Sequence, residues 1–141
     1  MSAASNYTED RTLDYWLKAN SAASTSPATV YVALFTTDDS TGGTSDLLEA
    51  GTLTNEVTTV ATAYVRKAVT FGVITNGSVS NSGNITFDTA TANWGTITHI
   101  AVMDASTSGN VLFYGSLDTA REILTDDTFQ ITTGNLTVTL A

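Results

Sequence analysis

Apolar and polar residues alternate with a period of two over much of this chain, which is the pattern of half-buried β-strands. The clearest example is the segment TVYVALFTT at residues 29–37, in which both faces of the strand are apolar. A two-layer sandwich covers only one face of each sheet. We therefore expect the second face of this strand to be covered by a helix, a loop or a partner chain.

Shorter segments of the same kind follow along the chain, separated by residues that favour turns: AYVRKAVTFGVI, SVS, NITFDT, WGTITHIAVMD, NVLFYGSL, TFQIT and NLTVTLA. The Asn76-Gly77 pair predicts a type I′ hairpin turn, because both central residues of that turn need a positive φ. Gly134 and Asn135 predict another tight turn between the last two strands. About eight short strands with turn residues between them are typical of a sandwich or jelly roll. We predict an all-β fold, an antiparallel β-sandwich or jelly-roll-like single domain over residues 1–141.

One segment near the N-terminus has helical periodicity instead. In TEDRTLDYWLKANS, the apolar residues Leu13, Trp16 and Leu17 fall on one face at helical spacing. Asp14 precedes Lys18 by four residues, which favours an ion pair along the helix. We predict a short helix over about residues 8–19. Because so short a helix is marginal in isolation, its apolar face must dock on the sheet or on another subunit.

The segment from about residue 38 to 61 lacks strand periodicity and concentrates acids and glycines. We predict a long surface loop with little core burial. Its carboxylates at Asp38, Asp39, Asp46 and Glu49 are the only candidate ligands for calcium, but their spacing does not match an EF-hand. We therefore expect solvated acids here and no metal site.

Charge and composition exclude several classes of function. The 141 residues include 5 basic and 14 acidic ones, with a net charge of −9, which argues against binding to nucleic acid through its phosphates. The chain has no cysteine, so folding in a reducing cytoplasm is the simplest expectation. No segment approaches the roughly 20 apolar residues of a membrane span, and the first residues do not have the pattern of a secretory signal. We expect neither a nucleic-acid nor a membrane partner.

The only histidine, His99, precedes Asp104 by five residues and Ser106 by seven, which raises the question of a hydrolase site. Strand alternation places His99 and Asp104 on opposite faces, so they cannot pair directly. Ser106 lies in a run of turn-forming residues, and the chain has no G-x-S-x-G elbow. We predict that His99 is structural and that Asp104 or Asn110 hydrogen-bonds the backbone of the turn.

Other charged pairs also favour a structural interpretation. Asp126 and Asp127 are adjacent, and neighbours in sequence do not face each other across the gap that glycosidase carboxylates need. Arg66 and Lys67 point to opposite faces of a strand, where we expect them to meet the protein's own carboxylates. No phosphate-binding glycine loop is present in the sequence. We predict no catalytic residue, no cofactor and no enzyme activity.

The ordered set of segments resembles a known family. The segments that carry the resemblance are LDYWL, SPATVYVALFTTD, YVRKAVTFG, NGSVSNSGNITFDTATANWGTITHIAVMDA, GNVLFYGSL and DTFQITTGNLTVTL. Together they resemble small virion proteins of tailed bacteriophages that are often labelled tail fibre proteins. The resemblance extends over nearly the whole chain except the long acidic loop. It implies a structural role in the virus particle, without enzyme activity or cofactor.

Three functional hypotheses remain open at this point. The first is a capsid decoration, or cement, protein bound to the major capsid protein, because the chain shows neither an attachment segment nor the repetitive shaft of a fibre. The second is a tail fibre or tail-adaptor protein. The more remote third is a carbohydrate-binding jelly roll in which Trp94 and Tyr114 stack on sugars, although Trp94 beside Gly95 is typical of a core anchor.

Two apolar surfaces are candidates for docking. One is the helix face with Leu13, Trp16 and Leu17, and the other is the strand face with Ile100 and Val102. Apolar surface left exposed on a single chain favours closed symmetric assembly. We therefore predict a homo-oligomer, a trimer or dimer, that binds other virion proteins. The expected location is the virion, after assembly in the host cytoplasm.

Overall fold

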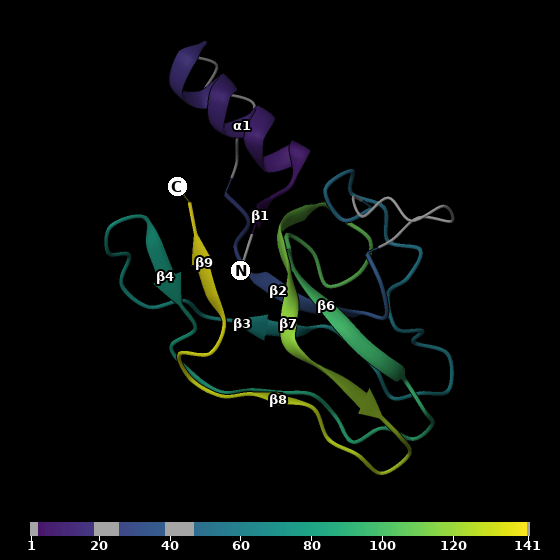
Figure 1. Ribbon diagram of the computed structural model, residues 1–141. Coiled ribbons are helices and arrows are strands. Elements are labelled where there is room, and N and C mark those ends of the chain that lie inside the picture. Colours follow the sequence, from purple (N-terminus) through teal and green to yellow (C-terminus); the bar gives the residue numbers. More distant parts are fainter. Residues whose placement is uncertain (1–2, 19–25, 39–46, 141) are drawn as a thin grey trace.

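The computed structural model describes residues 3–18, 26–38 and 47–140. Figure 1 shows the elements in this order: β1 (Ala3–Ala4), α1 (Asn6–Leu17), β2 (Val30–Phe35), β3 (Lys67–Val69), β4 (Ser78–Ser80), β5 (Ile85–Thr86), β6 (Gly95–Met103), β7 (Val111–Ile123), β8 (Gln130–Ile131) and β9 (Thr137–Thr139). All strand pairs are antiparallel. The predicted all-β fold with a short N-terminal helix is confirmed.

The strands form one five-stranded sheet, in the order β1-β7-β6-β2-β3, and the two short pairs β4-β9 and β5-β8. The two short pairs follow one another along the same two chain segments, residues 78–87 and 129–139, and so make one interrupted ribbon. This ribbon packs on one face of the sheet, which gives two layers. The jelly-roll form of the prediction is not confirmed, because the described strands do not divide into the two four-stranded sheets of that fold.

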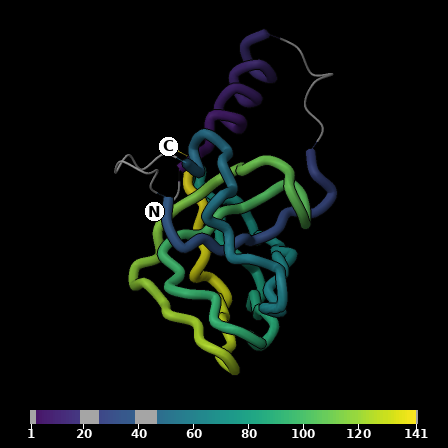
Figure 2. The backbone as a smooth tube through the Cα atoms, turned by 90° about the vertical axis from the view of Figure 1, so that its right-hand side faces the viewer, coloured from purple at the N-terminus to yellow at the C-terminus, as the bar shows by residue number. Residues whose placement is uncertain are grey.

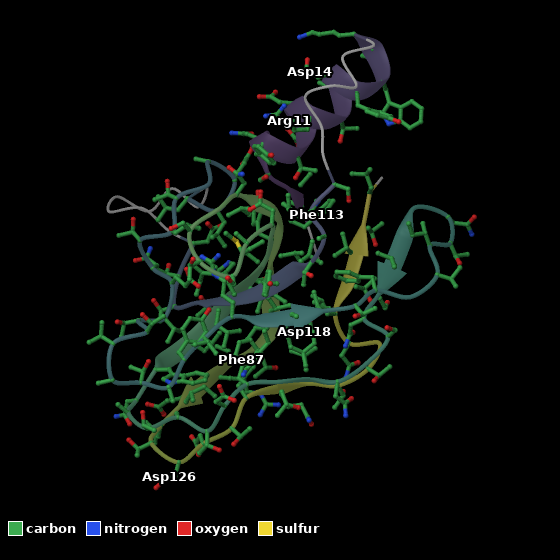
Figure 3. All side chains as sticks on the ribbon, turned by 180° about the vertical axis from the view of Figure 1, so that it is seen from behind. Arg11, Asp14, Phe87, Phe113, Asp118 and Asp126 are labelled. Carbon is green, nitrogen blue, oxygen red and sulfur yellow. The ribbon has the colours of Figure 1, made fainter. Side chains whose placement is uncertain are left out.

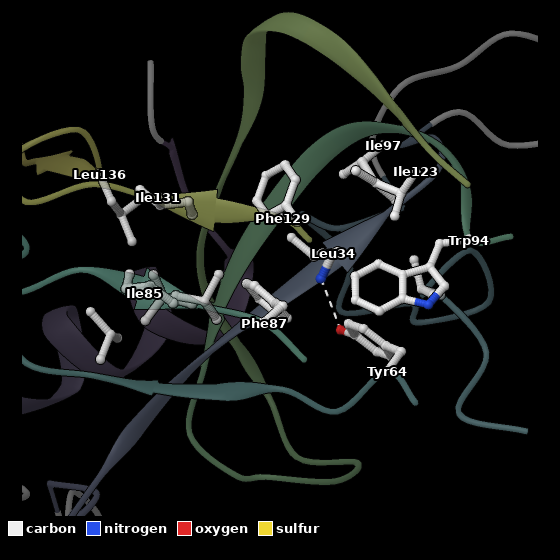
Figure 4. Packing of buried hydrophobic residues seen from close by; sticks show 14 of the residues in the cluster. Leu34, Tyr64, Ile85, Phe87, Trp94, Ile97, Ile123, Phe129, Ile131 and Leu136 are labelled. Carbon is white, nitrogen blue, oxygen red and sulfur yellow. Dashed lines mark hydrogen bonds between the residues drawn. The ribbon is translucent and has the colours of Figure 1, made fainter. Parts of the chain in front are cut away.

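The main core lies between the sheet and the ribbon (Figure 4). Val32 and Leu34 of β2 contribute from the sheet, and Phe87 and Phe129 from the ribbon. Aromatic rings are its centre: Tyr64 stacks on Phe87 at 6.1 Å between ring centroids, and Phe87 meets Phe129 edge-on at 5.7 Å. Such pairs stabilise a core beyond the area that they bury.

The opposite face of the sheet has a smaller core of its own. Ala33 and Phe35 of β2 pack there with Met103 of β6, and Leu48 and Leu53 cover them. The loop prediction is therefore wrong in its claim of little core burial, since Leu48 is 1% exposed. The physical reason is the two-faced β2: its second apolar face needs a cover, and the described part of the segment provides one.

The pairing of β6 with β7 is interrupted in two places. Ile97 lies opposite Arg121 but His99 lies opposite Ser116, so the four residues 117–120 of β7 face Thr98 alone. Bulges of this kind bend a strand and change its twist. As a result, Ile97 joins the main core on the same side as Val102, whereas uninterrupted alternation would place the two on opposite faces.

The second interruption is one residue long. Val102 pairs with Phe113 and Met103 with Val111, which leaves Leu112 as an extra residue of β7. Its carbonyl group has no place in the ladder with β6 and is available to another segment.

The turns follow the sequence closely. Asn76 and Gly77 have φ angles of 51° and 73°, as a type I′ turn requires, so this prediction is confirmed. Asp126 has a φ of 73° and lies in a turn, as predicted for that acidic pair. The turn at Gly134 is also present, with the Asn135 amide donating to the carbonyl of Thr132. The strands beside it, however, pair with β5 and β4 and not with each other.

A buried ion pair connects the chain segments around β2. The Arg66 guanidinium donates from Nε and Nη2 to the two carboxylate oxygens of Glu56, each at 2.7 Å. Its Nη1 donates to the carbonyls of Ala105 at 2.8 Å and Ser108 at 2.7 Å, in the turn between β6 and β7. Burial lowers the pKa of Arg66, but the hydrogen bond and attraction to Glu56 outweigh it and raise the pKa overall. The guanidinium therefore stays charged and holds both segments.

We expect Glu56→Gln to lower the free energy of unfolding by about 3 kcal/mol, because it leaves the buried charge of Arg66 without a counter-charge. Urea unfolding followed by tryptophan fluorescence measures this change. The matched control is Asp88→Asn, which breaks the ion pair of Asp88 with Lys67. Because the Asp88 side chain is 58% exposed, the control should cost less than about 1 kcal/mol. Equal losses in the two variants would contradict the role assigned to the buried pair.

Candidate docking surface

The helix α1 is held to the β body by its first turn. The Ser5 amide donates to the Leu112 carbonyl at 3.1 Å, and Thr8 Oγ1 donates to the same carbonyl at 2.8 Å. Ser5 Oγ also bonds the carbonyl of Val111 and caps the helix by accepting from the Thr8 amide. Leu112 is the extra residue of the β7 bulge, so the bulge supplies the carbonyl that anchors the helix. The helix begins at Asn6 and ends at Leu17, two residues before each predicted end.

The rest of α1 projects away from the body, as Figures 1 and 2 show. None of its residues is buried. The exposed fractions are 55% for Leu13, 47% for Tyr15 and 75% for both Trp16 and Leu17. Of the two predicted ways to cover this face, docking on the chain's own sheet is therefore excluded for the described residues. Another subunit or another protein remains.

Two charged side chains of this segment have partners within the segment itself. Lys18 Nζ lies 2.9 Å from a carboxylate oxygen of Asp14, which confirms the ion pair predicted from their spacing. The Arg11 guanidinium lies over the ring of Tyr7, 5.3 Å from its centroid. Figure 3 shows Arg11 and Asp14 on the projecting helix. The apolar side chains are thus the part of the helix that gains most from a contact.

The two other predicted docking residues lie apart from the helix face. Val102 is in the main core and only 4% exposed, although it lines the bottom of the same groove as Ile100. Ile100 is half-buried, packs against the main core and lines a groove. The structure therefore does not join Ile100 and Val102 with Leu13, Trp16 and Leu17 into one patch.

The groove at Ile100 lies between β7 and the ribbon strands β8 and β9, and the sequence patterns do not predict it. Its central part has a volume of about 360 Å³ and is lined by residues 113–118 and 134–138. One end continues into a space of about 800 Å³ that residues 127–132 line. The other end joins an apolar cavity of about 450 Å³ that Pro27 and Leu112 also line. The groove thus runs along the body to the base of α1.

His99 has a structural partner. Thr98 Oγ1 donates to the Thr36 carbonyl at 2.9 Å and lies 2.8 Å from His99 Nδ1. Because the hydroxyl has one proton, it must accept its second bond from the His99 ring. Asp104 accepts instead from the amide and side chain of Asn110, at 2.7 and 2.8 Å. The predicted turn contact of Asp104 is confirmed, and His99 and Asp104 do not form a catalytic pair.

The acids proposed as calcium ligands have other roles where they are described. Asp38 is buried and accepts from the Leu48 amide at 2.7 Å, which positions the cover of the smaller core. Glu49 lies 3.5 Å from the Tyr114 hydroxyl, whose pKa is raised by burial and then by the Glu49 carboxylate. Asp39 and Asp46 lie outside the described residues. Within the part of the chain that is described, no three metal-ligating side chains come together.

The aromatic and basic residues considered for binding are occupied inside the protein. Trp94 is 5% exposed, and its Nε1 donates to the Thr62 carbonyl at 2.8 Å. It is therefore a core anchor, as the sequence suggested, and cannot stack on a sugar. Arg66 pairs with Glu56 and Lys67 with Asp88, which confirms that this basic doublet meets the protein's own carboxylates.

These features define a class: a small β-rich protein with an exposed apolar helix and an open groove. None of the helices in the described part of the chain has the length and apolar character needed to cross a lipid bilayer. The chain belongs to the family described as podophage GP4 fiber I protein gp80, whose model matches residues 3–139. It is therefore a structural protein of a phage virion, as the resemblance implied. No curated protein sequence matches this chain.

We expect His99→Gln to change the free energy of unfolding by less than about 1 kcal/mol, because the side chain is half-buried and its bond is to a neighbouring hydroxyl. Thermal unfolding of both proteins measures the change. A larger loss, or loss of a hydrolytic activity of the purified protein, would show that the structural role assigned to His99 is wrong.

Proposed function

We propose that this chain is a non-enzymatic subunit of the phage tail fibre apparatus that assembles through α1. The observation that carries the proposal is the helix face of Leu13, Trp16 and Leu17, which projects from the body and buries nothing. The family description supports a fibre more than the capsid cement protein that the lack of a repetitive shaft had favoured.

The physics of the helix supports its burial in an assembly. An isolated helix of 12 residues is marginal in water, and the hydrogen bonds that join α1 to β7 come from its first turn. Burial of each large apolar side chain contributes roughly 1.5–3 kcal/mol. Docking would therefore stabilise both the contact and the last two turns of the helix.

The assembly that we propose is a homo-oligomer, a dimer or trimer, in which the helices pack side by side around a symmetry axis. Positions 13, 16 and 17 repeat at the spacing of helix-bundle contacts. The net charge of −9 makes the bodies repel one another, whereas residues 6–18 carry three acids and two bases. Repulsion between copies is therefore weak at the helices. The outer surface of such an assembly would remain for other virion proteins.

We expect the triple variant Leu13→Gln, Trp16→Gln and Leu17→Gln to be monomeric, while the unmodified chain sediments as a dimer or trimer. Glutamine keeps helix propensity and removes the apolar face. The control replaces Val60 and Val65, which are 77% and 48% exposed on the body, with serine and should keep the oligomer. Sedimentation velocity measures all three proteins. A monomeric unmodified chain at high concentration, or an oligomeric triple variant, would contradict assembly through α1.

The location in the particle is a separate prediction. Gold-labelled antibodies against this chain should bind at the tail of intact phage particles, because the proposal assigns the chain to the fibre apparatus. The same particles labelled with antibodies against the major capsid protein serve as the control for shell labelling. Label around the whole shell would contradict the fibre assignment and favour the cement protein.

A further inference from the structure

We propose that the groove beside β7 binds an extended, basic segment of a different virion protein, which adds a strand to the free edge of β7. The proposal rests on the virion role stated above, but it does not depend on the contact made by α1. It concerns another face of the molecule, where a partner would form backbone hydrogen bonds with the edge of a strand.

The lining of the groove shows that it follows strand edges. Side chains of a strand alternate between its two faces, so a groove over one face is lined by every second residue. Here the wall on the β7 side consists of consecutive residues. Residues 113–118 line the central part of the groove, and residues 117–119 line the space that adjoins it. The facing wall is equally continuous, with residues 127–132 and 134–138. The groove therefore runs between the edge of β7 and the ribbon, and Ile100 and Val102 of β6 also line it.

The outer edge of β7 is open over most of its length. β1 pairs with it only at Phe113 and Tyr114. From Gly115 to Glu122, no strand of the described residues pairs with this edge. The bulge at 117–120, opposite Thr98 alone, also loosens the pairing with β6. Backbone N–H and C=O groups without partners on a strand edge are a template for a further strand.

The side chains of the groove indicate the composition of the added strand. Ile100 and Leu117 are half-buried and pack against the main core, so they offer apolar contacts to alternate side chains of an incoming strand. Three acids, Asp118, Glu122 and Asp127, line this part of the groove against one base, Arg121. Asp118 and Glu122 are exposed and form no ion pair with any described residue. We infer a segment that alternates apolar residues with lysine or arginine.

A second copy of this chain is a poor occupant. It carries a net charge of −9 and five basic residues, of which Arg66 and Lys67 already pair within the chain. Repulsion between like charges disfavours such a contact, and complementary charge favours a basic partner. The occupant that fits is therefore another protein of the virion.

Hydrogen exchange of the backbone amides tests strand addition directly. The probe is the chain within intact phage particles, compared with the purified chain in the same buffer, by mass spectrometry after proteolysis. Amides of residues 115–122 should exchange at least about tenfold more slowly in the particle, because they gain hydrogen-bond partners. Amides of β2 are the internal control and should not change. Amides of α1 report separately on the helix contact, so failure of one proposal is distinguishable from failure of the other.

Two results would overturn the proposal. Equal exchange of residues 115–122 in particles and in the purified chain would show that no strand is added. Protection of these amides in the purified chain at high concentration would show that a second copy occupies the groove.

A pair of variants tests the charge of the partner. Asp118→Asn removes one rim carboxylate, whereas Ser106→Lys makes the same change in net charge at an exposed position of the β6–β7 turn outside the groove. Phage carrying Asp118→Asn should retain severalfold less of the chain after washing at moderate salt, and Ser106→Lys should retain the normal amount. Equal retention in the two variants would overturn the assignment of a basic segment.

Discussion

The buried pair of Arg66 with Glu56 is the interaction on which the arrangement of the sheet depends. Through Glu56 it positions the hydroxyl of Tyr64, which donates to the carboxylate at 3.0 Å and accepts from the Leu34 amide at 2.9 Å. Burial, and then the charge of Glu56, raise the pKa of Tyr64, so this hydroxyl keeps its proton and its role as donor. A charge buried so deeply is tolerated only when its hydrogen bonds are complete. The network therefore requires β2, the segment before β3 and the β6–β7 turn to be in place together.

The same network explains why the two sides of the sheet differ. β3 pairs with β2 only from Val30 to Val32, and beyond that point the edge of β2 is closed by residues 55–57 and by the Tyr64 hydroxyl. On the other side, β1 is two residues long and closes only the beginning of the β7 edge. Proteins normally protect such edges, because an open one invites pairing. The edge of β2 is thus closed within the chain, whereas no described strand pairs with the outer edge of β7 beyond Tyr114.

The sequence predicted what burial and turn chemistry determine. The two-faced β2, the helical spacing of Leu13, Trp16 and Leu17, and the Asn76-Gly77 turn all leave a local pattern. The extension of β7 beyond Leu117 leaves none, because residues on an exposed edge need not be apolar and so show no alternation. The same holds for the cover formed by Leu48, whose partner on β2 lies far away in the chain. Bulges depend on the register between two strands, which one segment alone does not encode.

The anchoring of α1 on the bulge of β7 determines how mechanical load enters the molecule. A pull on the helix passes through Ser5 and Thr8 to the carbonyls of Val111 and Leu112. These residues belong to the β6–β7 pair, the most extensively paired strands of the sheet. Force applied to the helix is therefore spread over the backbone bonds of this strand pair. A neighbour that holds α1 would hold the body through its longest pair of strands.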